Sequence, residues 1–135
     1  MIRLLTSFVL VTAPSLLAAE NLRLGRDEKA GTISVYRANL ANPILTQSAR
    51  PSQRPFLHPI VAPDGKGVLT EFSPGHHKHQ TGLYWGFTRV NGRDFFHNLK
   101  SDYWKRNSVR ILAQSGSSVS WQTSYDLLDS QGQPI

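Results

Sequence analysis

The stretch that decides the fold is Glu71–Asn98, which reads EFSPGHHKHQTGLYWGFTRVNGRDFFHN. Within it, Thr81–Arg89 alternates in the manner of a strand and carries bulky groups on both faces, which predicts a central strand covered on both sides. The next four residues, Val90–Arg93, predict a β-hairpin, because Asn-Gly accepts the positive φ angles of a type I′ turn. Asp94–His97 is then expected to return as the partner strand.

Outward from this stretch, apolar and polar residues continue to alternate with the period of two that half-buried strands show. The chain has ten glycines and eight prolines in 135 residues, which fits a turn-rich β protein. After residue 19 no segment shows the 3.6-residue period of a helix. The sequence therefore predicts an all-β fold, an antiparallel β-sandwich. The expected strands outside the opening stretch cover residues 32–36, 44–46, 55–61, 68–71, 109–114 and 119–127.

Two segments near the C-terminus bear on the extent of the domain. Ser101–Asn107 is polar around Tyr103 and Trp104 and is expected to form a loop. Asp129–Gly132 predicts a turn, yet the sequence ends three residues later, so the second strand of that hairpin is expected to lie beyond it. We therefore expect residues 20–135 to be the N-terminal part of a longer sandwich domain.

Residues 1–19 have the order of a secretory signal peptide, with a basic residue, an apolar run and then small residues. Arg3 precedes the run, and cleavage is expected after Ala19. The run is shorter than the ~20 residues of a membrane span and is interrupted by Pro14. A buried N-terminal helix is the alternative. No later stretch is long enough to cross a bilayer, so the sequence predicts a soluble mature protein in the periplasm or outside the cell.

The formal charge is +6, with 15 Lys and Arg residues against 9 Asp and Glu residues. The basic residues are scattered singly among acidic ones and form no stripe that would follow a phosphate backbone. We therefore expect no nucleic-acid partner. The chain has no cysteine, which excludes disulfides and thiolate metal sites.

The motif HHKHQTG at residues 76–82 is the main candidate for a functional site. In an extended segment, residues two apart share a face, so the rings of His77 and His79 are expected to lie side by side. Paired imidazoles suit zinc, copper or iron. They equally suit acid–base catalysis near neutral pH. A hydrogen-bonded network of purely structural histidines is the alternative.

Two further histidines are candidates for the same cluster. His58 and His97 would complete it, with Glu71 or Asp94 as the carboxylate partner. His58 stands among apolar neighbours, however, and taken alone it fits a structural histidine better than a catalytic one.

Aromatic residues beside polar groups indicate a sugar-binding surface, because one face of a pyranose is apolar while its hydroxyls need polar partners. Tyr103 and Trp104, next to Asp102 in the expected loop, are the better candidates for such contacts. Trp85 is expected to lie in the core, because the alternation of its strand points it inward.

A series of separate motifs occurs in order along the middle of the chain. They are RPFLHP at 54–59, PDG at 63–65, TE at 70–71, the histidine motif at 76–82, Trp85, and VNGRDF at 90–95. In this order they resemble a family of secreted bacterial proteins that often carry the label "methane oxygenase PmoA". The chain departs from that family at His76, where many relatives carry aspartate, and at Gln80, where many carry histidine.

The resemblance implies a β-sandwich-rich domain longer than this chain. It does not imply methane oxidation, because the oxygenase subunit that lent the label spans the membrane several times. Relatives occur in bacteria rich in polysaccharide-degrading systems, so the resemblance favours a role with carbohydrates.

The leading hypothesis is an exported β-sandwich protein with a histidine-rich pocket for a carbohydrate or glycan-derived ligand. A divalent metal is an open alternative, and its candidate ligands are His77 and His79. The competing hypothesis is a noncatalytic structural or ligand-binding module, and a metal-dependent oxygenase is the less favoured third. The expected catalytic residues are His77, His79, His58 and Glu71. The expected substrate-binding residues are Arg54, Gln80, Arg93, Asp94, Tyr103 and Trp104.

Overall fold

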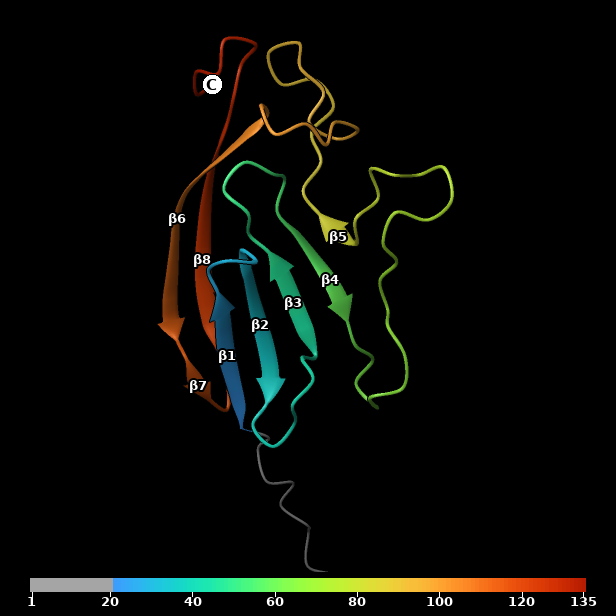
Figure 1. The fold of residues 1–135 in the computed structure, drawn as a ribbon, viewed down its shortest axis with the longest axis vertical. Helices are drawn as coiled ribbons and strands as arrows, with labels where there is room; N and C mark the ends of the chain where they lie inside the picture. Colours follow the sequence, from blue (N-terminus) through green and yellow to red (C-terminus); the bar gives the residue numbers. More distant parts are fainter. Residues whose placement is uncertain (1–20) are drawn as a thin grey trace, which may run out of the picture.

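The computed structural model describes residues 21–135, and this part of the chain forms eight strands and no helix (Figure 1). The expected all-β antiparallel fold is therefore confirmed. The expected signal peptide at 1–19 lies outside the described residues. Within residues 21–135 no helix is long and apolar enough to cross a membrane.

The larger of two sheets has six antiparallel strands in the order β5-β4-β3-β2-β1-β7 (Figure 1). Neighbouring strands from β1 to β5 follow one another in the chain, although β4 and β5 are separated by a long loop-rich segment. Its strands are β1 (Leu22–Asp27), β2 (Thr32–Arg37), β3 (Leu45–Ser48), β4 (Phe56–Ile60), β5 (Leu83–Tyr84) and β7 (Ser115–Gly116).

The second sheet is the long antiparallel pair of β6 (Trp104–Ala113) and β8 (Ser120–Leu127). It packs against one face of the larger sheet, and the core forms between them. Leu24 and Ile33 are at the centre of this core, and Val109, Ile111 and Trp121 from the second sheet pack against them. In Figure 1, β4 and β5 lie on the side of the larger sheet away from β6 and β8.

In the middle of the larger sheet, alternation along β2 sends apolar side chains to the inner face and hydroxyl side chains to the outer face. On β2, Ile33 and Val35 are buried in the core, so Thr32 and Ser34 point the other way. Paired residues on antiparallel strands share a face. Thr32 pairs with Ser48, and Ser34 pairs with Thr46, to which it is also hydrogen-bonded at 2.9 Å between hydroxyls. The uncovered face of β2 and β3 is thus lined with hydroxyl groups.

The prediction of a central strand at Thr81–Arg89 is wrong. Only Leu83–Tyr84 is a strand, and it lies at the edge of the larger sheet. Trp85 is 68% exposed and Phe87 is 42% exposed, so neither is in the core. Gly82 explains part of the difference, because its φ of +95° breaks the extended backbone immediately before the strand.

The predicted type I′ turn is confirmed. Asn91 and Gly92 both have positive φ, 46° and 81°, and the amides of Val90 and Arg93 donate to each other's carbonyl oxygens at 3.1 and 2.9 Å. The expected partner strand at 94–97 does not form a ladder. Instead, the Asp94 carboxylate accepts hydrogen bonds from the amides that follow it, and this turns the chain away.

The expected loop at Ser101–Asn107 is only partly correct. Trp104 begins β6 and is 5% exposed, and its ring meets the ring of the fully buried Phe95 edge-on at 5.8 Å. Trp104 is therefore a core residue. The polar residues next to it in the sequence suggested a loop, but they do not determine whether its side chain is buried. The turn expected at Asp129–Gly132 is present, and Ile135 donates its amide back to Leu127 at 3.0 Å.

Candidate functional site

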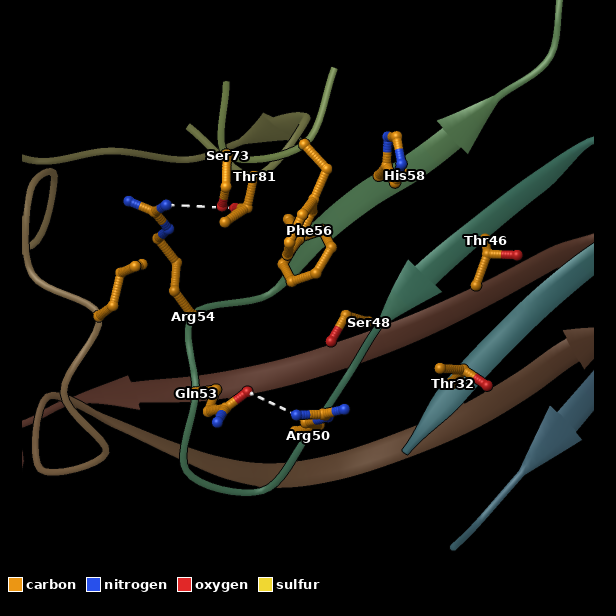
Figure 2. A pocket seen from close by; sticks show the side chains of 12 residues that line it. Thr32, Thr46, Ser48, Arg50, Gln53, Arg54, Phe56, His58, Ser73 and Thr81 are labelled. Carbon is orange, nitrogen blue, oxygen red and sulfur yellow. Dashed lines mark hydrogen bonds between the residues drawn. The ribbon is translucent and has the colours of Figure 1, made fainter. Parts of the chain in front are cut away.

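A cavity of about 520 Å³ lies on the polar outer face of the larger sheet; we call it the outer-face cavity (Figure 2). Its floor follows from the strand register, since Phe56 of β4 pairs with Ser48 and His58 lies two residues further on. Most of its lining residues have polar side chains, although apolar atoms form most of the lining surface, and two aromatic rings are among them. The lining residues are Thr32, Thr46, Ser48, Arg50, Gln53, Arg54, Phe56, His58, Phe72, Ser73, Thr81 and Leu99.

The connection between β3 and β4, residues 49–55, brings two arginines to this cavity. The second sheet holds this connection in place. The Tyr125 hydroxyl donates to the Arg50 carbonyl at 3.0 Å, and the Arg106 amide donates to the Pro51 carbonyl at 2.6 Å. Burial raises the pKa of Tyr125 to about 12, so its hydroxyl stays protonated as a donor at neutral pH.

Arg54 is the most connected side chain of the site and is only 4% exposed. Its guanidinium donates to the carbonyl oxygens of Phe96 and His79 and to the Thr81 hydroxyl, the last at 3.2 Å (Figure 2). The Cζ atom lies 3.6 Å from the centre of the Tyr84 ring, within cation–π range. Burial lowers the pKa of Arg54, and its interactions with Tyr84 oppose that shift.

His58 points from β4 toward the same cavity (Figure 2). Its Nδ1 lies 2.9 Å from the Thr70 hydroxyl oxygen, which also accepts the Ile60 amide at 3.1 Å. The Thr70 hydroxyl hydrogen is therefore available to donate to Nδ1, and this favours the neutral tautomer with the proton on Nε2. The ring packs 5.5 Å from Phe72. His58 thus combines a fixed ring with a donor suited to a ligand hydroxyl.

The histidine motif lies in a loop that leads toward β5, and its backbone turns there instead of running extended. A bridge between Phe72 and Thr81 closes the loop, and the Ser73 amide donates to the Gln80 carbonyl at 2.6 Å. Two successive tight turns occupy the residues between them. We call residues 73–80 the histidine loop. Ser73 of this loop lines the outer-face cavity, whereas the histidines are linked to it through the backbone, because Arg54 holds the carbonyl of His79.

The imidazoles of the loop form a row on the surface. Ring centres are 4.0 Å apart for His76 and His77, 5.9 Å for His77 and His79, and 4.8 Å for His79 and His97. We call these four residues the imidazole row. His77 and His79 do come together as expected, although through turns rather than strand alternation. None of the four lines the outer-face cavity, and the contacts of His58 are with Thr70 and Phe72 instead.

Among residues 21–135, no group of three or more His, Asp or Glu side chains is arranged to hold a metal ion. A divalent metal at His77 and His79 therefore stays a proposal that rests on those two rings. Partial desolvation and the neighbouring His97 lower the pKa of His79, so its ring tends to be neutral near pH 7.

Asp94 ends the imidazole row. Its carboxylate accepts the amides of His97 and Phe96 and contacts the Nδ1 of His97 at 2.7 Å. The bonds from the backbone and then the ring of His97 lower the pKa of Asp94 below its ordinary 3.8. Since the folded-state pKa is depressed, this stabilisation is present above pH 3.8 and is lost as the pH falls through the folded-state value.

We expect His97→Ala to raise the pKa of Asp94 only part of the way to 3.8, because the backbone bond from residue 97 remains. An NMR pH titration of the Asp94 carboxyl carbon measures this. The matched control is His76→Ala, at the far end of the row, which should leave the midpoint unchanged. Equal midpoints in the parent protein and His97→Ala would contradict the assigned bond.

The remaining expected site residues lie elsewhere. Glu71 and Gln80 line a neighbouring cavity of about 410 Å³, together with Thr70 and Tyr84. The Cζ atom of Arg93 lies 3.7 Å from the centre of the Tyr103 ring, and its guanidinium donates to the Leu128 carbonyl at 2.8 Å. Arg93 and Tyr103 therefore secure the C-terminal turn. Of the ten expected site residues, Arg54 and His58 line the outer-face cavity.

A third cavity, of about 460 Å³, opens between the two sheets beside β4 and β5 and is lined largely by aromatic side chains. Trp85 and Tyr125 are among them. The polar Gln47 in its lining already accepts from the Trp121 indole at 2.6 Å and donates to the Thr123 hydroxyl at 3.1 Å. Trp104 also lines this cavity, and its indole Nε1 is buried without a hydrogen-bond partner within residues 21–135.

Sequence reasoning missed the hydroxyl-bearing floor of the outer-face cavity. Thr32 and Thr46 were expected only as polar positions of strands, and Ser48 was expected in a loop. The available signal was that Thr32 and Ser34 of β2, and Thr46 and Ser48 of β3, are small hydroxyl residues at alternate positions. Small hydroxyls on an uncovered sheet leave room for a ligand.

The fold and the cavity define the class of protein: an antiparallel β-sandwich with a polar, ligand-sized cavity on the open face of its larger sheet. The chain belongs to a family of unknown function, DUF6807, whose model matches residues 33–134. The comparisons found no match among curated proteins and none among solved structures. The family description names no activity, so the resemblance to the PmoA-like proteins stays an expectation.

Proposed function

We propose that this protein is exported and binds or processes a carbohydrate or glycan-derived ligand in the outer-face cavity. The observation that carries the proposal is the composition of that cavity. Hydroxyl, amide, imidazole and guanidinium groups line it together with the rings of Phe56 and Phe72. A sugar needs this combination, since its ring has an apolar face and its hydroxyls require donors and acceptors.

The size of the cavity agrees with this proposal. Its volume of about 520 Å³ falls within the range of roughly 300–1,000 Å³ in which small-molecule pockets lie. The floor comes from paired strands rather than from loops, so Ser48, Phe56 and Thr32 are held rigidly. A preformed floor lowers the entropic cost of binding a ligand.

Within the proposal, His58 is the residue best placed for a chemical role. The Thr70 bond at Nδ1 fixes its ring and leaves Nε2 for the ligand. In a binding protein Nε2 would donate to a sugar hydroxyl, and in an enzyme it would act as an acid–base group near neutral pH. The histidine loop supports the site through Arg54, and Ser73 is its one residue in the cavity lining.

We expect His58→Ala to weaken sugar binding about five- to tenfold, the value of one lost hydrogen bond between neutral groups. Isothermal titration calorimetry with a panel of neutral and acidic mono- and trisaccharides measures this. His76→Ala is the matched control, because His76 is exposed and does not line the cavity. Equal affinities of His58→Ala and the parent protein would remove His58 from the site, and failure of every sugar to bind would overturn the proposal.

Export is supported by the order of residue types in positions 1–19. Cleavage after Ala19 would leave Glu20 as the first residue. N-terminal sequencing of protein recovered from the periplasm or the medium checks this.

A further inference from the structure

The guanidinium of Arg54 is a buried positive charge without a carboxylate partner among residues 21–135. Other arginines do have carboxylates nearby: Arg26 pairs with Glu28 at 2.6 Å, and Arg93 lies 3.6 Å from Asp102. Arg54 instead contacts backbone carbonyls, the Thr81 hydroxyl and the face of Tyr84. These groups are dipoles, so they satisfy hydrogen bonds without neutralising the charge. An arginine cannot lose its proton in a protein, and an uncompensated buried charge is costly.

One donor of Arg54 is also left over. Its Nε–H is buried and has no hydrogen-bond partner in the described chain. Buried donors are nearly always paired, so the unpaired Nε–H adds to the cost of burying this guanidinium. Arg54 lines the outer-face cavity, so an anion held there is the nearest group that could compensate its charge.

The other charged residue in the cavity lining is also positive. Arg50 lines it as a second arginine, and within residues 21–135 its Nη1 donates to the neutral amide oxygen of Gln53, at 3.3 Å (Figure 2). The twelve lining residues include no aspartate and no glutamate. A cavity for a neutral sugar has no need of two cations, whereas a carboxylate or sulfate matches the fork of a guanidinium.

We propose that the ligand of the outer-face cavity is an acidic sugar, with a carboxylate or a sulfate ester held between Arg50 and Arg54. This inference rests on the proposed function and names its ligand class. The hydroxyls of the floor then hold the sugar ring, and Phe56 and Phe72 cover its apolar face. The anionic group compensates the positive charges of Arg50 and Arg54. Pairing of the buried guanidinium charge with this anion adds to the binding affinity.

Calorimetric titration of the full chain with matched sugars tests the proposal. The probes are galactose, galacturonic acid and galactose 6-sulfate, each as the monosaccharide and as a trisaccharide, with the glucose series in parallel. We expect one acidic form to bind at least about tenfold more tightly than its neutral counterpart. The preference should shrink as sodium chloride rises from 20 to about 300 mM, because salt screens charge pairs. The carboxylate and sulfate arms show which anion is recognised.

Variants test whether the preference for acidic sugars arises in the outer-face cavity. Arg50→Gln should reduce the acidic-over-neutral ratio about tenfold, since Arg50 is exposed and the fold does not depend on its guanidinium. Arg54→Lys keeps the charge but not the fork, and it should reduce the ratio less than Arg50→Gln does. Arg110→Gln is the control, because it removes one exposed charge on β6 outside the cavity.

The outcomes separate the two proposals. Equal affinity for neutral and acidic sugars would overturn the acidic-ligand inference while the carbohydrate function stands. An acidic preference that Arg110→Gln lowers as much as Arg50→Gln would also overturn it, because the effect would then come from overall charge. Binding of neither kind of sugar would overturn the proposed function itself.

Discussion

Replacing Arg54 with methionine is expected to lower the free energy of unfolding by about 3 kcal/mol. The change removes the donors to the carbonyls of Phe96 and His79 and to the Thr81 hydroxyl. Each buried acceptor left without a donor costs about 1–3 kcal/mol. Removing the unpaired buried charge offsets part of that sum, and the contact with Tyr84 limits the offset. The loss of acceptor bonds is therefore the larger effect.

Urea unfolding followed by tryptophan fluorescence measures this change. The control is Arg110→Met, at an exposed position of β6, which should change the stability by less than about 0.5 kcal/mol. Arg54→Met should also release the histidine loop, and amide hydrogen exchange of residues 79–81 should rise with it. A loss below about 1 kcal/mol with an unchanged loop would show that Arg54 does not hold this region together.

Phe95→Ala is expected to cost about 3–5 kcal/mol, the range observed when a fully buried aromatic ring is deleted. Phe95 is 0% exposed. Its ring meets those of Tyr103 and Trp104 edge-on, with centres 5.3 and 5.8 Å away. The residue therefore attaches the Asn91-Gly92 hairpin to the start of β6. Few neighbouring groups can move to fill the space, because rigid rings surround it.

Thermal and urea unfolding measure this second effect. Trp85→Ala is the matched control, since it deletes a larger aromatic ring that is 68% exposed, and it should cost less than about 1 kcal/mol. The two variants also test the finding that Thr81–Arg89 is not a buried central strand. If Trp85→Ala proved the more destabilising of the two, Trp85 would lie in the core, as the alternation of Thr81–Arg89 alone predicted.

Much of the fold could be predicted from local patterns. The alternation of Thr32, Ile33, Ser34 and Val35 depends only on neighbouring residues, and so does the Asn91-Gly92 turn; the structure has both. Burial of Trp85 and Trp104 could not be predicted in this way. Whether a large ring is buried depends on which distant strand pairs beside it, and this information lies outside a local window.

The candidate site was only partly predictable for a related reason. Arg54 and His58 were both expected site residues, His58 as a possible member of a histidine cluster, and both line the outer-face cavity. Thr46 and Ser48 join them through the register of β3 with β2 and β4, which the sequence does not specify locally. The histidine motif was expected to form the site because of its composition. Its rings instead lie on the surface beside the outer-face cavity, and the backbone carbonyl of His79 accepts a hydrogen bond from Arg54.

The most direct test of the central claim is a map of amide chemical shifts in the ¹⁵N-labelled protein as the tightest-binding sugar of the matched set is added. We expect the largest changes at Ser48, Gln53 and Thr81, around the outer-face cavity, and only small changes at His76 and at Trp85. Changes concentrated on the imidazole row or on the aromatic cavity, with residues 48–54 unaffected, would contradict binding in the outer-face cavity.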